Sequence, residues 1–315
     1  MKNLKHQVTE LLNSEIGEKQ VFIKLPGGEV PIKFKKVPNS KELLIIFHGA
    51  LNREKNTLPY FTNFANELKN VSQLSVSDPS MLTHKIHTAS WYAGHEGFES
   101  QKILQELFQN IVELSNFQRI VFLGGSAGGF ASLFYSSFIS KSVAIAANPQ
   151  TIIQWGPGPT SYRENCWPHI TSNEQLPEKI CVNLCEWYSV PRVNTIVYVQ
   201  SAGDFIHTRR HLAPFLATIS KVKDSRFILD SGFWGTLGHD GSAPAKAFLP
   251  WVRAAFSSQT TEVNDILTTK YNLLSHEEPE LKSTLNDGIA RCSSDLNLNN
   301  LIRDYQLRQI KDYQK

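Results

Sequence analysis

The sequence of 315 residues predicts an α/β protein whose mostly parallel sheet is covered by helices on both faces. Short, continuous apolar runs such as residues 43–47 are typical of strands that are buried on both faces. These runs alternate with segments of helical period, and strand–helix–strand crossovers place consecutive strands parallel. Hydrophobic residues make up 41% of the chain and charged residues 19%, which is enough apolar material for a core and excludes a disordered protein.

The composition, the length of the apolar runs and the first 15 residues exclude several classes of protein. A net charge of +3 is too small to indicate a nucleic-acid binder. No apolar run approaches the length of about 18 residues that a membrane helix needs. The first 15 residues are polar, which predicts no cleaved signal peptide and a cytoplasmic protein. The four cysteines are too few for a disulfide scaffold and are predicted to be reduced thiols.

The elements follow one another in an order that supports this fold. Segments 21–25 and 30–34 alternate with period two around a Pro-Gly-Gly turn, which predicts a hairpin at the edge of the sheet. Further strands are predicted at 43–47, 73–77, 120–123, 143–146, 195–199 and 226–229. Helices are predicted at 61–68, 103–112, 127–138, 211–219 and 244–256, from apolar residues that recur at helical spacing.

Two stretches fall outside this alternation. Residues 150–192 hold several prolines and tryptophans without a clear period, which predicts a lid-like insertion over one end of the sheet. Residues 259–315 are polar and weakly helical. We therefore predict a main domain over residues 1–258 and a C-terminal helical extension over residues 259–315.

The strongest chemical signal is the segment Gly124-Gly125-Ser126-Ala127-Gly128, which lies between a predicted strand and a predicted helix. A serine hydroxyl becomes a nucleophile when a sharp strand-to-helix turn exposes it and a base takes its proton. Glycines two residues before and after the serine relieve the crowding of such a turn. The alternative interpretation is a glycine-rich turn that only packs a helix against a strand.

A nucleophile of this type needs an acid and a histidine later in the chain, in that order. Asp204 follows the predicted strand 195–199, and His239 follows the strand 226–229 in a Gly-His-Asp-Gly loop. The carboxyl ends of parallel strands meet at one edge of the sheet, where open α/β folds bind ligands. We therefore predict that His239 accepts the proton of Ser126 and that Asp204 orients the imidazole.

Each partner has alternatives in the sequence. Asp230 ends the last predicted strand and could replace Asp204 as the acid. Asp240 neighbours His239 and is interpreted as a loop hydrogen-bonder. His207 and His211 do not follow the last strand, and they are interpreted as surface or helix residues.

The amides that would stabilise an oxyanion are predicted at two places. The N–H of Ala127 lies at the start of the helix after the serine. The first buried strand runs into His48-Gly49-Ala50, where glycine allows a close approach and the N–H of Ala50 can face the developing charge. His48 and Gly49 are predicted to contact the substrate, with the alternative that His48 braces the loop.

This ordered set of His48-Gly49, Gly124-x-Ser126-x-Gly128, Asp204 and Gly238-His239 resembles the α/β-hydrolase superfamily over about residues 20–258. Three shorter segments are similar to bacterial capsular-polysaccharide biosynthesis proteins of the same type, some of which are O-acetyltransferases that use acetyl-CoA. These segments are Ser77-Asp78-Pro79-Ser80, Trp91-Tyr92-Ala93-Gly94 and Asn148-Pro149-Gln150-Thr151. The resemblance implies the α/β-hydrolase fold and acyl-transfer chemistry.

Two further groups of residues lie in the insertion. Cys181 and Cys185, with Cys166 and His169 nearby, could suggest zinc, but no second matched pair exists and a thiol-rich helix face explains them as well. No metal is therefore predicted. The tryptophans Trp155, Trp167 and Trp187 could line an acceptor pocket or form the core of a lid, and we predict that Trp155 and Trp167 bind substrate.

We therefore expect an acyl-enzyme on Ser126 with neither a metal nor a redox cofactor. If water is the acceptor, the protein is a carboxylic-ester hydrolase acting on an acylated small molecule or glycan, which is the primary expectation. If a sugar hydroxyl is the acceptor, it is an O-acetyltransferase with acetyl-CoA as co-substrate, modifying a capsular or surface polysaccharide. The third alternative is a non-catalytic scaffold of hydrolase fold in polysaccharide assembly.

Overall fold

The computed structural model describes residues 3–64, 66–82, 88–155, 158–233 and 243–277. The chain divides into two compact units, Met1–Thr269 and Lys270–Lys315, and the fold below is that of the first unit. The domain boundary predicted after residue 258 stays a prediction. Within the described ranges, none of the helices is both long and apolar enough to cross a bilayer.

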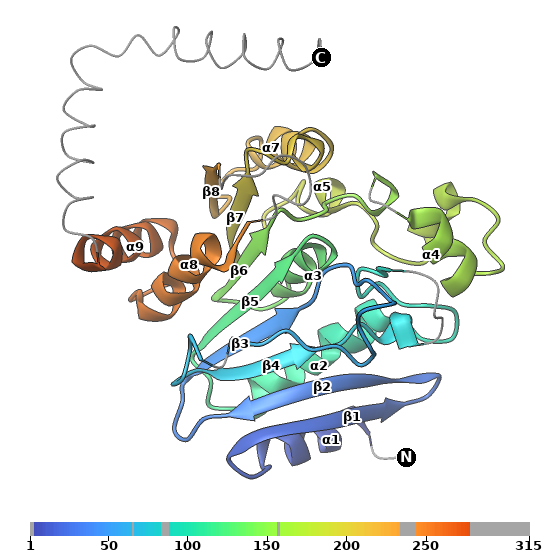
Figure 1. Cartoon of the computed structure of the whole chain (residues 1–315), viewed down its shortest axis with the longest axis horizontal. Helices are drawn as coiled ribbons and strands as arrows, with labels where there is room; N and C mark the ends of the chain where they lie inside the picture. The colour runs from blue at the N-terminus through green and yellow to red at the C-terminus, as the bar shows by residue number, and fades with distance from the viewer. Residues whose placement is uncertain (1–2, 65, 83–87, 156–157, 234–242, 278–315) are drawn as a thin grey trace, which may run out of the picture. The chain divides into compact units, whose positions relative to one another are not determined.

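An eight-stranded sheet forms the centre of the fold, in the order β1-β2-β4-β3-β5-β6-β7-β8 (Figure 1). The hairpin strands β1 and β2 pair antiparallel at one edge, β2 pairs antiparallel with β4, and all remaining pairs are parallel. This confirms the predicted mostly parallel sheet with a hairpin at its edge. The strands are β1 (Gly17–Leu25), β2 (Gly28–Lys36), β3 (Glu42–Phe47), β4 (Ser72–Val76), β5 (Arg119–Gly125), β6 (Ser142–Ala147), β7 (Thr195–Ser201) and β8 (Phe227–Gly232).

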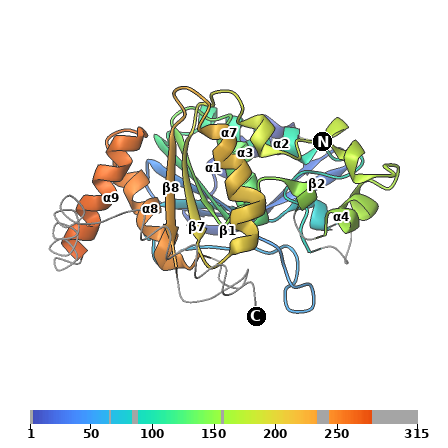
Figure 2. The ribbon, with the colours of Figure 1, turned by 90° about the horizontal axis from the view of Figure 1, so that it is seen from above.

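Helices cover both faces of this sheet, as predicted. One layer is a chain of contacts from α1 to α2, α3, α5 and α7, while α8 packs on β5, β6 and β7 from the other side (Figure 2). The longer helices are α1 (Leu4–Leu12), α2 (Ser100–Leu114), α3 (Ala127–Ser136), α7 (Ala213–Ile219), α8 (Ala245–Ser257) and α9 (Val263–Glu277). The shorter ones are η1 (Pro79–Leu82), η2 (Ile153–Trp155), α4 (Pro159–Cys166), η3 (Asn173–Glu178), α5 (Leu184–Trp187), α6 (Phe205–His207) and η4 (Thr208–Leu212).

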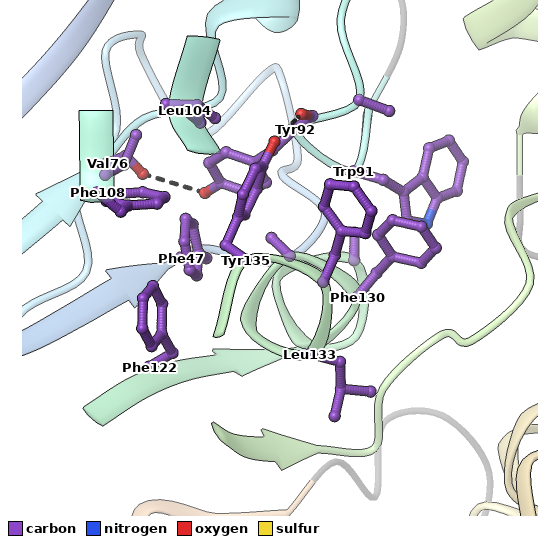
Figure 3. Packing of buried hydrophobic residues seen from close by; sticks show 14 of the residues in the cluster. Phe47, Val76, Trp91, Tyr92, Leu104, Phe108, Phe122, Phe130, Leu133 and Tyr135 are labelled. Carbon is purple, nitrogen blue, oxygen red and sulfur yellow. Dashed lines mark hydrogen bonds between the residues drawn. The ribbon is translucent and has the colours of Figure 1, made fainter. Parts of the chain in front are cut away.

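The two-layered cover explains the continuous apolar runs in the sequence. Leu44 and Ile45 are neighbours in β3 and point to opposite faces of the sheet, yet both are 0% exposed. The ring of Phe47 at the end of this strand packs edge-on against Tyr92, with ring centroids 4.9 Å apart. Figure 3 shows this ring between those of Tyr92 and Phe122 in the buried cluster. The carboxyl end of β3 is therefore fixed by aromatic packing close to where the site residues follow.

The helix predicted at 61–68 is wrong: in its described residues the segment has no regular helix. The reason lies in the polar side chains of the neighbouring strand β4. The side-chain amide of Gln73 accepts from the N–H of Phe64 and donates to its carbonyl, at 3.0 and 3.1 Å. The hydroxyl of Ser75 donates to the carbonyl of Thr62 at 2.5 Å. These bonds replace the backbone bonds of a helix, so the local apolar spacing does not decide the conformation.

The predicted insertion, residues 150–192, contains the short helices η2, α4, η3 and α5. It is anchored to the segment before α2 and to the first turn of α2. The hydroxyl of Tyr162 donates to the carbonyl of Gly94 at 2.6 Å. The side chain of Gln101 bonds both backbone groups of Cys181, at 2.9 and 2.8 Å. The insertion is thus a packed part of the first unit.

Candidate active site

Ser126 lies at the turn between β5 and α3, as predicted. Its backbone has φ 53° and ψ −117°, a left-handed conformation that is costly for a residue other than glycine and that often marks a functional position. A Cβ at Gly124 would lie 2.1 Å from the carbonyl oxygen of Gly128. A Cβ at Gly128 would lie 2.6 Å from the carbonyl oxygens of Phe47 and His48. Gly124 therefore permits the tight turn around Ser126, which we call the elbow, and Gly128 permits the close contact between this elbow and the end of β3.

The backbone of Ser126 is held on both sides by hydrogen bonds. Its N–H donates to the carbonyl of Ala147 at 3.0 Å, and its carbonyl accepts from the N–H of Gln150 at 3.0 Å. Its buried Oγ has no hydrogen-bond partner within the described ranges. No hydrogen bond from the described residues thus ties this hydroxyl to the packing around it.

A pocket of about 480 Å³ opens beside Ser126. The loop after β3 forms one of its walls, since a Cβ at Gly49 would lie 3.6 Å from the Cβ of Ser126. Ala127 follows directly as the first residue of α3, where backbone N–H groups have no partner inside the helix. The structure thus brings Ser126, Gly49 and Ala50 to one pocket, with Ala127 next in the chain. Its described lining is Ile46, Phe47, His48, Gly49, Ala50, Thr62, Phe64, Leu123, Gly124, Gly125, Ser126, Ala147, Asn148, Ala243 and Phe248.

His48 lines this pocket, but both of its ring nitrogens bond to the backbone. Nδ1 lies 2.7 Å from the carbonyl oxygen of Gly49, and Nε2 accepts from the N–H of Asp78 at 3.1 Å. This pairing assigns the proton to Nδ1 of a neutral ring. Burial lowers the pKa of the imidazole to about 4, which keeps the ring neutral. The geometry supports the alternative in which His48 braces the loop; the predicted contact with substrate stays a prediction.

Asp78 and Tyr92 complete the support of this loop, and reasoning from the chemistry of single residues missed both. The carboxylate of Asp78 accepts from the N–H groups of Ser80 and Tyr92, at 3.1 and 2.7 Å. The hydroxyl of Tyr92 accepts from the N–H of His48 at 2.8 Å and donates to the carbonyl of Val76 at 3.1 Å (Figure 3). The segments 77–80 and 91–94, noted for their resemblance to capsule proteins, were the only signal for these two residues.

Asp204 follows β7 and is fully buried, at the edge of the sheet where Ser126 also lies. Its Oδ1 accepts from the N–H of His207 at 3.1 Å, so it caps α6. Its Oδ2 lies 2.9 Å from Nδ1 of His207. His207 and His211 lie in α6 and η4 and are 4% and 1% exposed. They are helix residues, as one alternative predicted, and are not surface residues.

Asn148 connects Asp204 to the pocket and was not singled out for a role. It follows β6, which lies between β5 and β7, with φ 42°. Its Nδ2 donates to Oδ2 of Asp204 at 3.2 Å, and its Oδ1 accepts from the N–H of Ser201 at 2.7 Å. Because Asn148 also lines the pocket with Ser126, it fixes the Asp204 carboxylate relative to the wall of that pocket.

The predicted base, His239, lies outside the described residues, as do Gly238 and Asp240. The alternative acid, Asp230, lies in β8 and accepts from Nε1 of Trp251 in α8 at 2.5 Å. The roles of Asp204, Asp230 and His239 therefore stay predictions.

The structure does not bring the predicted tryptophans to this pocket, as far as its described lining extends. Trp167 is 8% exposed, and its Nε1 donates to the hydroxyl of Tyr162 at 3.0 Å, so it packs inside the insertion. Trp187 packs under the guanidinium of Arg192, 3.8 Å from the ring centre. Trp155 is 48% exposed and lines a separate hollow. Packing within the insertion therefore accounts for Trp167, and packing of the insertion against Phe134 and Phe138 accounts for Trp187.

The cysteines of the insertion are part of this packing. Cys166 and Cys185 are buried, and His169 bonds Glu96 at 2.7 Å rather than a thiol. Burial raises the pKa of Cys181 to about 12, which favours the thiol over the thiolate that metals bind. In the described ranges, no three acidic, histidine or cysteine side chains gather as a possible metal site.

Comparison with known proteins gives matches in structure only. No family model matches the sequence, and no curated protein matches it. The chain is similar to the capsule O-acetyltransferase of Neisseria meningitidis serogroup A, in a mutant bound to CoA, with a TM-score of 0.53 and 16% identity over 75% of this chain and 94% of that chain. It is similar to Pyrococcus horikoshii acylaminoacyl peptidase, with a TM-score of 0.53 and 13% identity over 84% of this chain and 46% of that chain. The chain therefore has the α/β-hydrolase fold that its ordered motifs predicted.

Proposed function

We propose that the protein catalyses acyl-ester chemistry through an acyl-enzyme on Ser126, with His239 as base and Asp204 as acid. The observation that carries this proposal is the left-handed backbone of Ser126 at the head of α3, beside a pocket that Ala50 also lines. A strained serine at this turn has no packing role that a smaller or more flexible residue would not fill better.

The proposed reaction has two steps. In the first, Oγ of Ser126 bonds to the ester carbonyl carbon, its proton passes to His239, and the alcohol leaves with that proton. In the second, the oxygen of an acceptor hydroxyl bonds to the acyl carbon while its proton passes to His239, the bond between that carbon and Oγ breaks, and His239 returns the proton to Oγ. The N–H groups of Ala127 and Ala50 stabilise the oxyanion in both steps. None of these steps requires a metal or a redox cofactor.

Water is the acceptor in our primary proposal, which makes the protein a carboxylic-ester hydrolase of an acylated small molecule or glycan. A sugar hydroxyl with acetyl-CoA as donor is the second candidate. It is favoured by the similarity to the capsule O-acetyltransferase, because the match extends over 94% of that chain and so concerns the whole fold. The same serine serves both reactions, and exclusion of water together with acceptor binding separates them.

The first test is covalent labelling of the serine with a fluorophosphonate probe. Ser126→Ala should abolish labelling and lower the turnover of p-nitrophenyl acetate by at least about 10⁴, because it removes the nucleophile. Ser132→Ala is the matched control: its hydroxyl lies on the same helix and donates to the carbonyl of Phe122 at 2.9 Å, so labelling should persist. Labelling of Ser126→Ala, or more than a tenth of wild-type turnover, would contradict the proposal.

A second measurement separates the acceptors. Acyl release from p-nitrophenyl acetate and from acetyl-CoA is followed with and without oligosaccharide acceptors. Hydrolysis that is independent of the oligosaccharide supports the primary proposal, and acetylated oligosaccharide with free CoA supports transfer. A wild-type protein that the fluorophosphonate does not label would favour the non-catalytic scaffold.

A further inference from the structure

A second hollow, of about 630 Å³, has a different character from the serine pocket. Its described lining consists of Gln154, Trp155, Arg209 and Arg210. Trp155 ends η2, which follows β6, and the arginines lie in η4, which follows β7. All three of these side chains are exposed. We call these four residues the Trp–Arg pocket.

The backbone that carries this pocket is fixed, although its side chains are exposed. The hydroxyl of Thr151 donates to the carbonyl of His211 at 2.9 Å, and the N–H of Thr151 donates to Nδ1 of His211 at 3.1 Å. Both residues are buried. These bonds join the segment before Trp155 to the helix turn of Arg209 and Arg210, so the indole and the guanidinium groups are held on one frame.

The segment that carries Trp155 is also bonded to the backbone of Ser126. The N–H of Gln150, the residue before Thr151, donates to the carbonyl of Ser126 at 3.0 Å. The segments of the Trp–Arg pocket follow β6 and β7, and Ser126 follows the adjacent strand β5, so all of them leave the same edge of the sheet. A ligand that reacts at Ser126 can therefore extend toward the Trp–Arg pocket along this edge.

The side chains of the Trp–Arg pocket are suited to a ligand that carries a negative charge. Across the described ranges, no carboxylate pairs with Arg209 or Arg210, which leaves two positive charges beside an exposed indole. A guanidinium matches carboxylates and phosphates with two parallel hydrogen bonds. An exposed indole offers a flat apolar face, and the amide of Gln154 can bond to hydroxyl groups.

We propose that the Trp–Arg pocket binds an anionic saccharide, a sugar ring that bears a carboxylate or a phosphate, of the glycan that reacts at Ser126. This inference rests on the proposed function at Ser126. The pocket is an open platform with one ring, and a saccharide chain can lie on one face of that ring and continue into solvent. Recognition of a nucleotide base usually also needs several hydrogen bonds to the edge of the base. Gln154 is the one neutral amide side chain in the described lining, so the pocket fits a saccharide better than a base.

The test measures binding in the Ser126→Ala background, so that no ligand is consumed. The probes are oligosialic acid, oligogalacturonate and phosphomannan oligosaccharides, with maltohexaose as the neutral probe and CoA as the nucleotide probe. We expect at least one acidic oligosaccharide to bind more tightly than maltohexaose, with an affinity that weakens as salt is raised. Adding Arg209→Gln and Arg210→Gln should weaken this binding by about tenfold or more, and adding Trp155→Ala by about fivefold.

The matched control removes the same charge elsewhere. Lys221 and Lys223 are exposed after α7, and Lys221→Gln with Lys223→Gln should leave the affinity within about twofold. All variants should keep the melting temperature of their background. The proposal is wrong if no acidic oligosaccharide binds better than maltohexaose, if the lysine control loses as much affinity, or if the arginine variant loses CoA binding alone. Because the assay does not use catalysis, its failure is distinguishable from a failure of fluorophosphonate labelling.

Discussion

The elbow around Ser126 and the Trp–Arg pocket follow adjacent strands of one sheet, but they are built in opposite ways. At the elbow the backbone carries the site: a strained serine, close glycines and amide groups held by buried partners. At the Trp–Arg pocket, buried hydrogen bonds between Thr151 and His211 hold the backbone, and Trp155, Arg209 and Arg210 are exposed. Under the two proposals above, the reaction at Ser126 depends on a fixed backbone, whereas the choice of ligand depends on side chains that can be changed without disturbing the buried hydrogen bonds.

The largest expected effect is at the proposed acid. Asp204→Asn should lower kcat by about 10⁴, because an amide cannot hold the imidazole in the required tautomer or stabilise its charge. The asparagine keeps an oxygen for the N–H of His207, so the cap of α6 should survive, but its amide nitrogen would face Nδ2 of Asn148, and the melting temperature should therefore fall. The measurement is steady-state turnover of p-nitrophenyl acetate together with thermal unfolding.

Asp230→Asn is the control for this prediction, because Asp230 is the alternative acid and its carboxylate already accepts from Trp251. We expect it to retain most of the turnover. If Asp230→Asn loses turnover and Asp204→Asn does not, then Asp230 is the acid and the assignment of Asp204 is wrong.

The second effect concerns the two tryptophans of the insertion. Trp167→Ala should lower the free energy of unfolding by about 3–5 kcal/mol, because it empties a buried site and breaks the bond to Tyr162. Trp155→Ala should change it by less than about 0.5 kcal/mol, because that ring is exposed. Urea unfolding of both variants tests the pair. A Trp167→Ala variant of unchanged stability would show that this ring is not part of the packing.

The third effect is the pH dependence of the free energy of unfolding that arises from Asp78 and His48, which hold the loop after β3. Burial raises the pKa of Asp78 from its ordinary 3.8 to about 6, so its contribution to stability is present below pH 4 and lost as pH rises through 6. Burial lowers the pKa of His48 from 6.5 to about 4, and its contribution has the opposite slope over the same window. In the wild-type protein the two slopes oppose each other.

Asp78→Asn removes one of these slopes. The free energy of unfolding of the variant minus that of the wild type should therefore rise by up to about 3 kcal/mol between pH 4 and pH 6.5, whatever constant cost the lost hydrogen bonds add. Urea unfolding at a series of pH values measures this difference. His48→Asn serves as the counterpart and should shift in the opposite direction. A difference that does not vary with pH would contradict the assigned burial effects.

The fold was largely predictable because local patterns and burial agree. Strand β3 reads as an apolar run since helices cover both of its faces, and the hairpin alternates since one of its faces is open. The prediction of a helix at 61–68 was wrong because backbone groups of this segment bond the side chains of Gln73 and Ser75 in β4. No local period contains that information. Helix α1 was not predicted either, although Asn3 caps it and Val8 and Leu11 recur at helical spacing.

The candidate site also contains a part that local sequence predicts and a part that it does not. Ser126 and its glycines are neighbours in the chain, so their spacing alone predicted the elbow. Asn148 and Asp204 are 56 residues apart, and His48 and Asp78 are 30 apart. Pairings across such separations depend on strand order, which a single sequence does not determine residue by residue. His48 and Asp204 were predicted from their places after strands, whereas the segments of Asp78 and Asn148 were noted only through family resemblance, and the contacts of all four became visible with the fold.

The smallest effect tests whether the elbow depends on the close packing of its backbone against the end of β3. Gly128→Ala places a Cβ 2.6 Å from the carbonyl oxygens of Phe47 and His48, so the loop of His48 or the start of α3 must shift. Overpacking of this kind costs about 1–3 kcal/mol of stability. The shift also moves the N–H of Ala50 relative to Ser126, and turnover should fall with stability. Gly125→Ala is the control, since among the described residues its Cβ would meet only the carbonyl of Ala147, at 3.4 Å. The melting temperature of both variants and the turnover of Gly128→Ala are measured. If Gly128→Ala is as stable as Gly125→Ala and fully active, the elbow tolerates backbone movement, and the contrast with the Trp–Arg pocket does not hold.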